Sequence, residues 1–278
     1  MKAGSQWDPV LHSAPMFSLG AVASNAPEFV PDEASRNWVA TSLMRVAAKL
    51  GAPAAAPRVV VSPPGKIVAR DFDSLFDMIC GVQELVGQGG VELTLVEVAP
   101  GNPPEIPDGF KMLGDPNGQM MNTLVRGDEY AMLYNPVAFR EDNLLRAAVA
   151  REIGRIGIHR NGGHDADLKP EDWIADAELG AIALGLGVWV TNGAYIFEQS
   201  CCGGGCGIDL KSLRAGLSMP EASFATALDT QRRGLSKRAV AKHLAATQKA
   251  AFKKSWALIS KAPPKALTAP ETVAALQA

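Results

Sequence analysis

The segment Leu144–Gly187, LLRAAVAREIGRIGIHRNGGHDADLKPEDWIADAELGAIALGLG, decides how the fold of this chain is interpreted. Apolar and small residues recur at helical spacing in two blocks, which predicts helices over 141–159 and 171–190 with a glycine-containing loop between them. In the first block Arg151 and Arg155 are four residues apart, so they share one helix face on either side of Glu152.

The residues before this segment predict mostly strands, and those after it predict helices. A helix over 32–50 and another over 71–86 are expected from their apolar periodicity. Strands are expected over 58–62, 91–98, 110–113, 120–125 and 130–134, the last three as an antiparallel meander. Further helices are expected over 209–217, 220–230 and 235–260. This order favours an α+β fold, in which a small, mostly antiparallel sheet packs on helices and a helical C-terminal half follows.

The order of elements over 120–187 resembles the zincin metallopeptidases. The strand YAMLYNP is followed by a helix containing VAREIGRIGIHR and by a second helix with an inward glutamate. In zincins, two histidines of an HExxH motif bind zinc from one helix face, and the intervening glutamate polarises the metal-bound water.

The resemblance assigns a role to each position of the motif. It places Arg151 and Arg155 where the two histidines stand, Glu152 at the general base and Gly154 at a helix-packing glycine. In the gluzincin branch the third ligand is a glutamate from the second helix, which corresponds to Glu178, 23 residues after Arg155.

The two arginines change what this site can do. Arginine keeps its charge and has no lone pair to offer a metal, so no zinc and no cofactor are expected at this site. We therefore expect a catalytically inactive zincin-like protein, a pseudo-metallopeptidase that serves as an interaction, scaffold or regulatory module for a protein partner. One of the arginines is expected to form a salt bridge with Glu178 across the two helices. The alternative is that both face solvent and pair locally with Glu141 or Glu152.

A second hypothesis keeps hydrolytic chemistry, through a displaced metal site or through Glu152 without a metal. His159 and His164 are potential ligands, although a histidine near a helix end also caps carbonyl groups. Cys201, Cys202 and Cys206 form a glycine-rich cluster that could hold a metal or act as a redox pair. Small buried thiols beside a glycine turn are the simpler interpretation of that cluster.

A third hypothesis is nucleic-acid or anion binding by the basic segment 232–265. Ten lysines and arginines and no acidic residue lie between Asp229 and Glu271. Residues 1–229 hold 17 basic and 28 acidic residues, a net charge of −11. The basic segment can therefore bind an external anion or pack as an amphipathic helix on the acidic remainder.

The domain organisation and location follow from composition. We expect an extended arm over 1–31, a zincin-like core over 32–190, a helical subdomain over 191–262 and a tail over 263–278. Four cysteines, three of them adjacent or nearly so, do not suggest a disulfide framework, which favours a cytoplasmic location. Residues 16–26 resemble a secretory signal only weakly. No apolar run approaches the roughly 18–20 residues of a membrane span.

Overall fold

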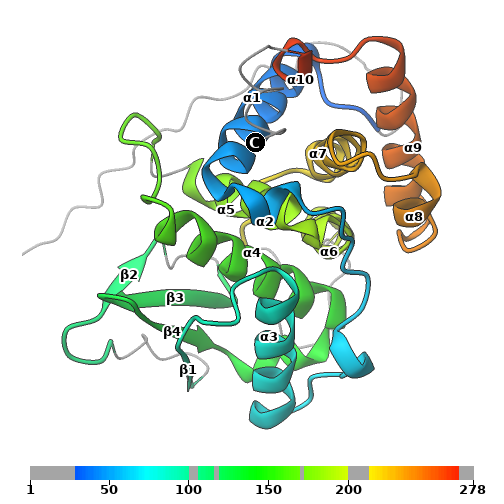
Figure 1. Cartoon of the computed structure of the whole chain (residues 1–278). Helices are drawn as coiled ribbons and strands as arrows, with labels where there is room; N and C mark the ends of the chain where they lie inside the picture. The colour runs from blue at the N-terminus through cyan, green and yellow to red at the C-terminus, as the bar shows by residue number, and fades with distance from the viewer. Residues whose placement is uncertain (1–28, 100–105, 116–118, 170–171, 200–212, 269–278) are drawn as a thin grey trace, which may run out of the picture.

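The computed structural model describes residues 29–99, 106–115, 119–169, 172–199 and 213–268. Its first half contains the helices α1 (Glu33–Leu50), α2 (Ala52–Ala55) and α3 (Phe72–Leu85) and the four strands of one sheet. The chain is mostly helical from α4 (Asp142–Arg160) onward (Figure 1). The expected α+β class is confirmed at this level.

The sheet is small and mixed. Its strands are β1 (Leu93–Glu97), β2 (Lys111–Leu113), β3 (Met121–Arg126) and β4 (Glu129–Tyr134), in the order β1-β4-β3-β2. The β2–β3 and β3–β4 pairs are antiparallel, as the predicted meander requires. β1 pairs with β4 in parallel, so β4 is an interior strand next to the edge strand β1. Tyr130–Tyr134 are all buried, which suits a strand with neighbours on both sides.

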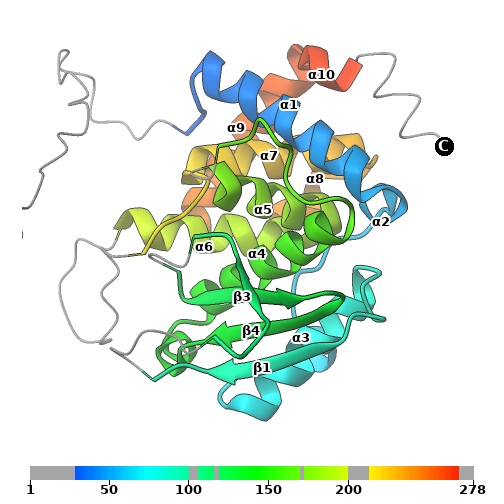
Figure 2. The ribbon, with the colours of Figure 1, turned by 90° about the vertical axis from the view of Figure 1, so that its left-hand side faces the viewer.

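Helix α4 lies between the sheet and the other helices. Figure 2 shows the sheet below α4, with α5 (Trp173–Ala181), α7 (Met219–Arg232) and α1 above it. Every residue of α4 from Ala147 to Ile158 is buried, because one side of the helix faces the sheet and the other faces α5 and α6 (Gly187–Gln199). The middle of this helix is therefore inside the molecule, including the charged residues Arg151, Glu152 and Arg155.

Two glycines allow α4 and α5 to approach closely. A Cβ on Gly154 would lie 2.1 Å from the carbonyl oxygen of Ala177, and one on Gly180 would lie 3.2 Å from the carbonyl oxygen of Gly154. Only hydrogen fits between these backbones, so the packing role predicted for Gly154 is confirmed. The touching helices also hold Glu178 of α5 opposite the arginines of α4.

The C-terminal helices pack against α1 and α6. They are α7, α8 (Lys237–Ala241), α9 (Ala246–Lys261) and α10 (Lys265–Thr268). The single helix expected over 235–260 is wrong, because the chain turns between α8 and α9. Asn192 of α6 holds that turn through its amide, which donates to His243 O at 3.2 Å and accepts from Ala245 N at 3.2 Å.

Two further expectations need correction. Residues 58–62 form no strand; Val60 N donates a single bond to Gly185 O, and no neighbouring strand extends the pairing. Of the helix expected over 209–217, residues 213–217 are not helical, since Gly216 and Leu217 direct their N–H groups to Glu178 instead of to helix carbonyls, and residues 209–212 lie outside the described residues. The expected division after residue 190 lies within α6, and it stays a prediction.

Within the described residues, one helical stretch is long and apolar enough to cross a membrane, judged by length and composition. It runs from Trp173 to Ala194 through α5, a π-helical stretch (Ile182–Leu186) and α6, with a mean hydropathy of 1.5. The apolar window of this stretch is entirely buried inside the molecule, as in the core helix of a soluble protein. The bounds of α1 and α3 agree with prediction, and their N-caps Asp32 and Asp71 accept bonds from Ser35 N and Ser74 N.

Candidate functional site

The site is a buried group of two arginines and two glutamates, Arg151, Glu152, Arg155 and Glu178, here called the arginine cluster. Arg151, Glu152 and Arg155 come from α4 and are 2%, 0% and 1% exposed. Glu178 comes from α5 and is 5% exposed. The alternative in which both arginines face solvent is therefore wrong.

Glu152 is the centre of the cluster. Its Oε1 accepts from Arg151 Nε at 3.1 Å, and its Oε2 accepts from Arg155 Nη1 at 2.6 Å and from Thr123 Oγ1 at 2.8 Å. Thr123 lies on β3, so this carboxylate also links the sheet to α4. Both oxygens are occupied by buried donors, two of them cationic, which compensates the cost of burying the charge.

Glu178 binds mainly to backbone. Its Oε1 accepts from Gly216 N at 3.2 Å and its Oε2 from Leu217 N at 2.8 Å. The predicted bridge to α4 is present, but it is a single long contact, with 3.9 Å between Arg151 Nη1 and Glu178 Oε1. Burial raises the pKa of Glu178, and Arg151 and the two backbone N–H groups only partly oppose this effect.

Arg155 has more donors than partners. Its Nη1 is bonded to Glu152, whereas its Nε and Nη2 are buried and have no hydrogen-bond partner. Gly114, just after β2, lies against this edge: a Cβ there would be 3.4 Å from both nitrogens. Burial lowers the pKa of Arg155, and the Glu152 carboxylate opposes that shift.

A cavity of about 360 Å³ adjoins Arg155. One wall is formed by Met112, Leu113 and Gly114 at the end of β2, and another by Arg155 and His159 of α4. The loop between α4 and α5 and the start of α5 close the remaining side, with Gly163, His164, Asp165, Ala166, Leu168 and Trp173. The cavity therefore lies on the side of the arginine cluster where Arg155 lacks partners.

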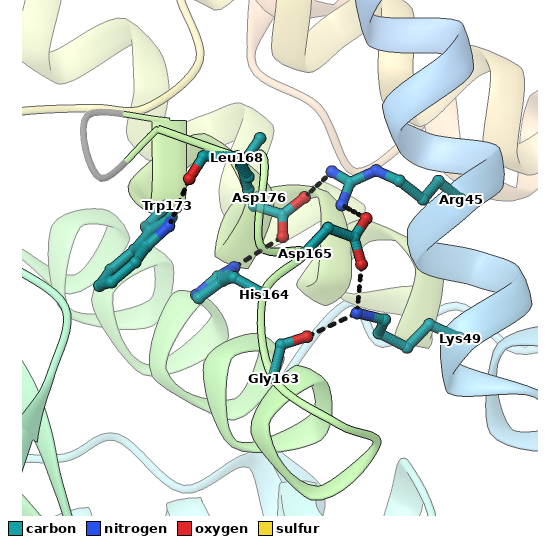
Figure 3. Close-up of polar contacts among 8 residues, drawn as sticks. All are labelled: Arg45, Lys49, Gly163, His164, Asp165, Leu168, Trp173 and Asp176. Carbon is teal, nitrogen blue, oxygen red and sulfur yellow. Dashed lines mark hydrogen bonds and ion pairs between the residues drawn. The ribbon is translucent and has the colours of Figure 1, made fainter.

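The two histidines that we considered as metal ligands are held separately. His159 Nδ1 is 2.9 Å from Tyr130 Oη, and burial, followed by the nearby His164, lowers the pKa of His159. His164 Nδ1 is 2.7 Å from Asp176 Oδ2, and its ring stacks on Trp173 at 5.1 Å between centroids (Figure 3). Among the described residues, no three His, Cys, Asp or Glu side chains are grouped to hold a metal.

The loop that carries His164 is tied to α1. Figure 3 shows Arg45 between Asp165 and Asp176, and Lys49 between Asp165 and Gly163. Asp165 Oδ2 is 2.5 Å from Arg45 Nη1, and its Oδ1 is 2.7 Å from Lys49 Nζ. These cations lower the pKa of Asp165, with the Lys49 hydrogen bond as the largest cause. Asp165 therefore lines the cavity as an already paired carboxylate.

The remaining candidate residues are either outside the described residues or in the C-terminal basic segment. Cys201, Cys202 and Cys206 lie outside the described residues, as do residues 1–28. In the basic segment, Arg232 and Arg233 are buried and pair with Asp229. Val240, Leu244, Phe252 and Ile259 of that segment are buried, as the amphipathic alternative requires.

Sequence reasoning missed several residues that shape the site. Thr123, Gly114, Trp173 and Asp176 were not singled out, and neither was Arg45 of α1. Asp176 and Glu178 are two carboxylates in an otherwise apolar helix. That pattern indicates that both are buried and need partners. No sequence signal located Gly114 opposite Arg155, since that contact depends on the path of β2.

Comparison with known proteins gives no further guidance: no family model matches this chain, and no curated protein or solved structure matches it either.

Proposed function

We propose that this chain is a non-catalytic, zincin-like protein that acts as an interaction or regulatory module. The observation that carries the proposal is the state of Glu152, the position that the resemblance assigns to the general base. Its two oxygens accept three buried hydrogen bonds, and none of its surface is exposed. A general base must contact the proton that it takes, and a carboxylate whose two oxygens are engaged by buried donors and closed off from solvent offers no such contact.

The positions of the two arginines support the same proposal. A zinc ligand must present a lone pair, and a guanidinium presents only donors and a positive charge. The two guanidinium groups are instead partners of Glu152, with Glu178 beyond them on α5. The cluster therefore has the character of a substituted ion site, in which fixed side-chain cations take the place of a bound one.

Elemental analysis of the purified chain, with and without added zinc, tests this proposal. We expect no stoichiometric zinc in the native protein, and no change of melting temperature on treatment with a chelator. The reverse variant, Arg151→His with Arg155→His, is expected to take up about one zinc ion per chain, because Glu178 can serve as the third ligand.

A matched control adds Glu178→Gln to the reverse variant, and it should bind zinc much more weakly. Circular dichroism of both variants checks that each is folded. Stoichiometric zinc in the native chain at Glu152 or Glu178, or chelator-sensitive peptidase activity, would overturn the proposal. A folded reverse variant that takes up no zinc would remove the zincin part of it.

A further inference from the structure

The strongest unused feature is the unpartnered edge of Arg155. The Nε and Nη2 donors of one guanidinium lie side by side in the plane of the group, and both lack partners. Arg155 is 1% exposed, so these donors have lost water without gaining an acceptor. Such a state is costly for a native protein, and a bound acceptor would relieve it.

A cavity lies next to these donors. Gly114, with φ +103°, packs against the guanidinium of Arg155, and it lines the same cavity as Arg155. The two donors are covered in this structure, and because residue 114 has no side chain, only its backbone lies against them there, so an acceptor in the cavity reaches them when this backbone shifts aside. A volume of about 360 Å³ is within the range of small-ligand sites.

The charges around the cavity favour an anion. Glu152 is shared by both arginines, and Glu178 receives two backbone N–H groups and only a 3.9 Å contact from Arg151. Asp165, on the cavity wall, is held by Arg45 and Lys49. Each carboxylate near the cavity thus has other partners, whereas Arg155 retains two free donors.

The remaining walls of the cavity favour an anion that carries an apolar group. Met112, Leu113 and Leu168 contribute aliphatic surface, and Trp173 contributes an aromatic ring that is stacked on His164. Two parallel N–H donors match the two oxygens of a carboxylate. An aliphatic or aromatic carbon group attached to it would fill the apolar part of the cavity.

We propose that this cavity binds a carboxylate carried on an apolar or aromatic group, with the carboxylate oxygens on Nε and Nη2 of Arg155. The ligand is a free carboxylic acid or the C-terminal carboxylate of a peptide with an apolar last residue. This inference deepens the proposed function, since it names what the arginine-containing site recognises, and it rests on Arg155 having a binding role rather than a catalytic one.

Titration calorimetry on the full chain tests the inference with three probes. Phenylacetate represents the free acid, N-acetyl-alanyl-leucine represents the peptide terminus, and phenylacetamide is the neutral match of the first. We expect saturable binding of at least one acid in the millimolar range or below, and no binding of the amide. Which acid binds identifies the source of the carboxylate.

Two variants assign the binding to Arg155. Arg155→Lys retains the charge beside Glu152 but removes the paired donors, so acid binding should weaken at least about tenfold. Gly114→Ala places a methyl group over the donor edge and should weaken it as well, while leaving the Arg155–Glu152 contact in place. Arg232→Lys, in the separate group around Asp229, is the matched control and should bind like the native chain.

The inference is overturned if neither acid binds the native chain, if the amide binds equally well, or if Arg155→Lys binds like the native protein. If either Arg155→Lys or Gly114→Ala does not fold, the other variant alone assigns the binding to Arg155. Zinc analysis is independent of these titrations: zinc in the native chain contradicts the proposed function, whereas absent acid binding contradicts only this inference.

Discussion

Two buried groups in this molecule each place one carboxylate between two arginines. They differ in which acceptors the remaining N–H groups of the arginines have. In the arginine cluster, Glu152 holds Arg151 and Arg155. In the second group, here called the α7 triad, Asp229 holds Arg232 at 2.6 Å and Arg233 at 2.5 Å. All the side chains of both groups are at least nine-tenths buried.

The α7 triad uses backbone carbonyls as its additional acceptors. Arg232 Nη2 donates to Ala54 O at 2.8 Å, and Arg233 Nη1 donates to Arg58 O at 2.6 Å and to Ala56 O at 3.2 Å. These bonds join the end of α7 to α2 and to the segment that follows it. Each of its two arginines has one nitrogen without a partner. The triad therefore links distant segments of the chain and has a structural role.

In the arginine cluster, both unpartnered nitrogens are on Arg155, adjacent to each other and beside a cavity. Thr123 is the only further donor to Glu152 within the described part of the chain, and no backbone carbonyl accepts from either arginine there. This difference shows that burial of an arginine pair does not by itself indicate function. The position of the guanidinium N–H groups that lack an acceptor is a better indication of a binding site.

The largest expected effect comes from removing the two central carboxylates. Glu152→Gln should lower the free energy of unfolding by about 3–5 kcal/mol, because two buried guanidinium groups lose their shared countercharge. Asp229→Asn should cost about 1–3 kcal/mol, since backbone carbonyls still accept from both of its arginines. Urea denaturation at constant m-value measures both. Equal costs would show that the carbonyls do not compensate and would remove the distinction between the two groups.

A smaller effect than that of Glu152→Gln is expected from Glu178, and it tests what this residue does in the cluster. Glu178→Ala should cost about 2–4 kcal/mol, because the N–H groups of Gly216 and Leu217 lose their acceptor in a buried place. The coupling between Glu178→Ala and Arg151→Met in a double-mutant cycle should stay below about 1 kcal/mol, given their 3.9 Å separation. A coupling near the full cost would mean that the interhelix ion pair dominates after all.

The smallest effect is expected at Asp165, where a carboxylate between two cations is partly open to solvent. Its side chain is 31% exposed, so Asp165→Asn should cost only about 1 kcal/mol at neutral pH. Lys49 and Arg45 lower the pKa of Asp165 in the folded state, so its contribution is complete above the unfolded pKa. The contribution disappears as the pH falls through the lowered folded pKa. Unfolding of both proteins between pH 7 and pH 2 should show the two stabilities converging in acid; a constant difference would contradict this assignment.

The sequence predicted the structure best for helices and hairpins whose bounds are indicated by their own residues. The bounds of α1, α3 and α4 followed from apolar periodicity and capping residues, and the β3–β4 hairpin followed from its turn. For Arg151 and Arg155 the sequence left two alternatives, and the structure combines them: the arginines are buried, as a bridge to Glu178 requires, but they pair mainly with Glu152, as the other alternative allowed.

What remained beyond prediction depends on contacts between distant segments. The parallel pairing of β1 with β4 joins residues more than 30 positions apart and has no local signal. Gly216 lacks a helix because its backbone passes over α5, where a Cβ would lie 2.2 Å from Ala175 N. The sequence showed Arg232 and Arg233 only as part of a basic segment, and it gave no indication of their carbonyl acceptors in α2 and just after it.

The contact between Gly154 and the backbone of α5 also has a mechanical consequence. Helices that meet through interlocking side chains can slide past each other when rotamers change, but here the backbones touch directly, and no rotamer is available to absorb a shift. We expect α4 and α5 to move as one rigid body. Any rearrangement that a ligand causes would then be taken up at their borders, for example at Gly185, whose φ of +98° interrupts the long helical stretch after α5.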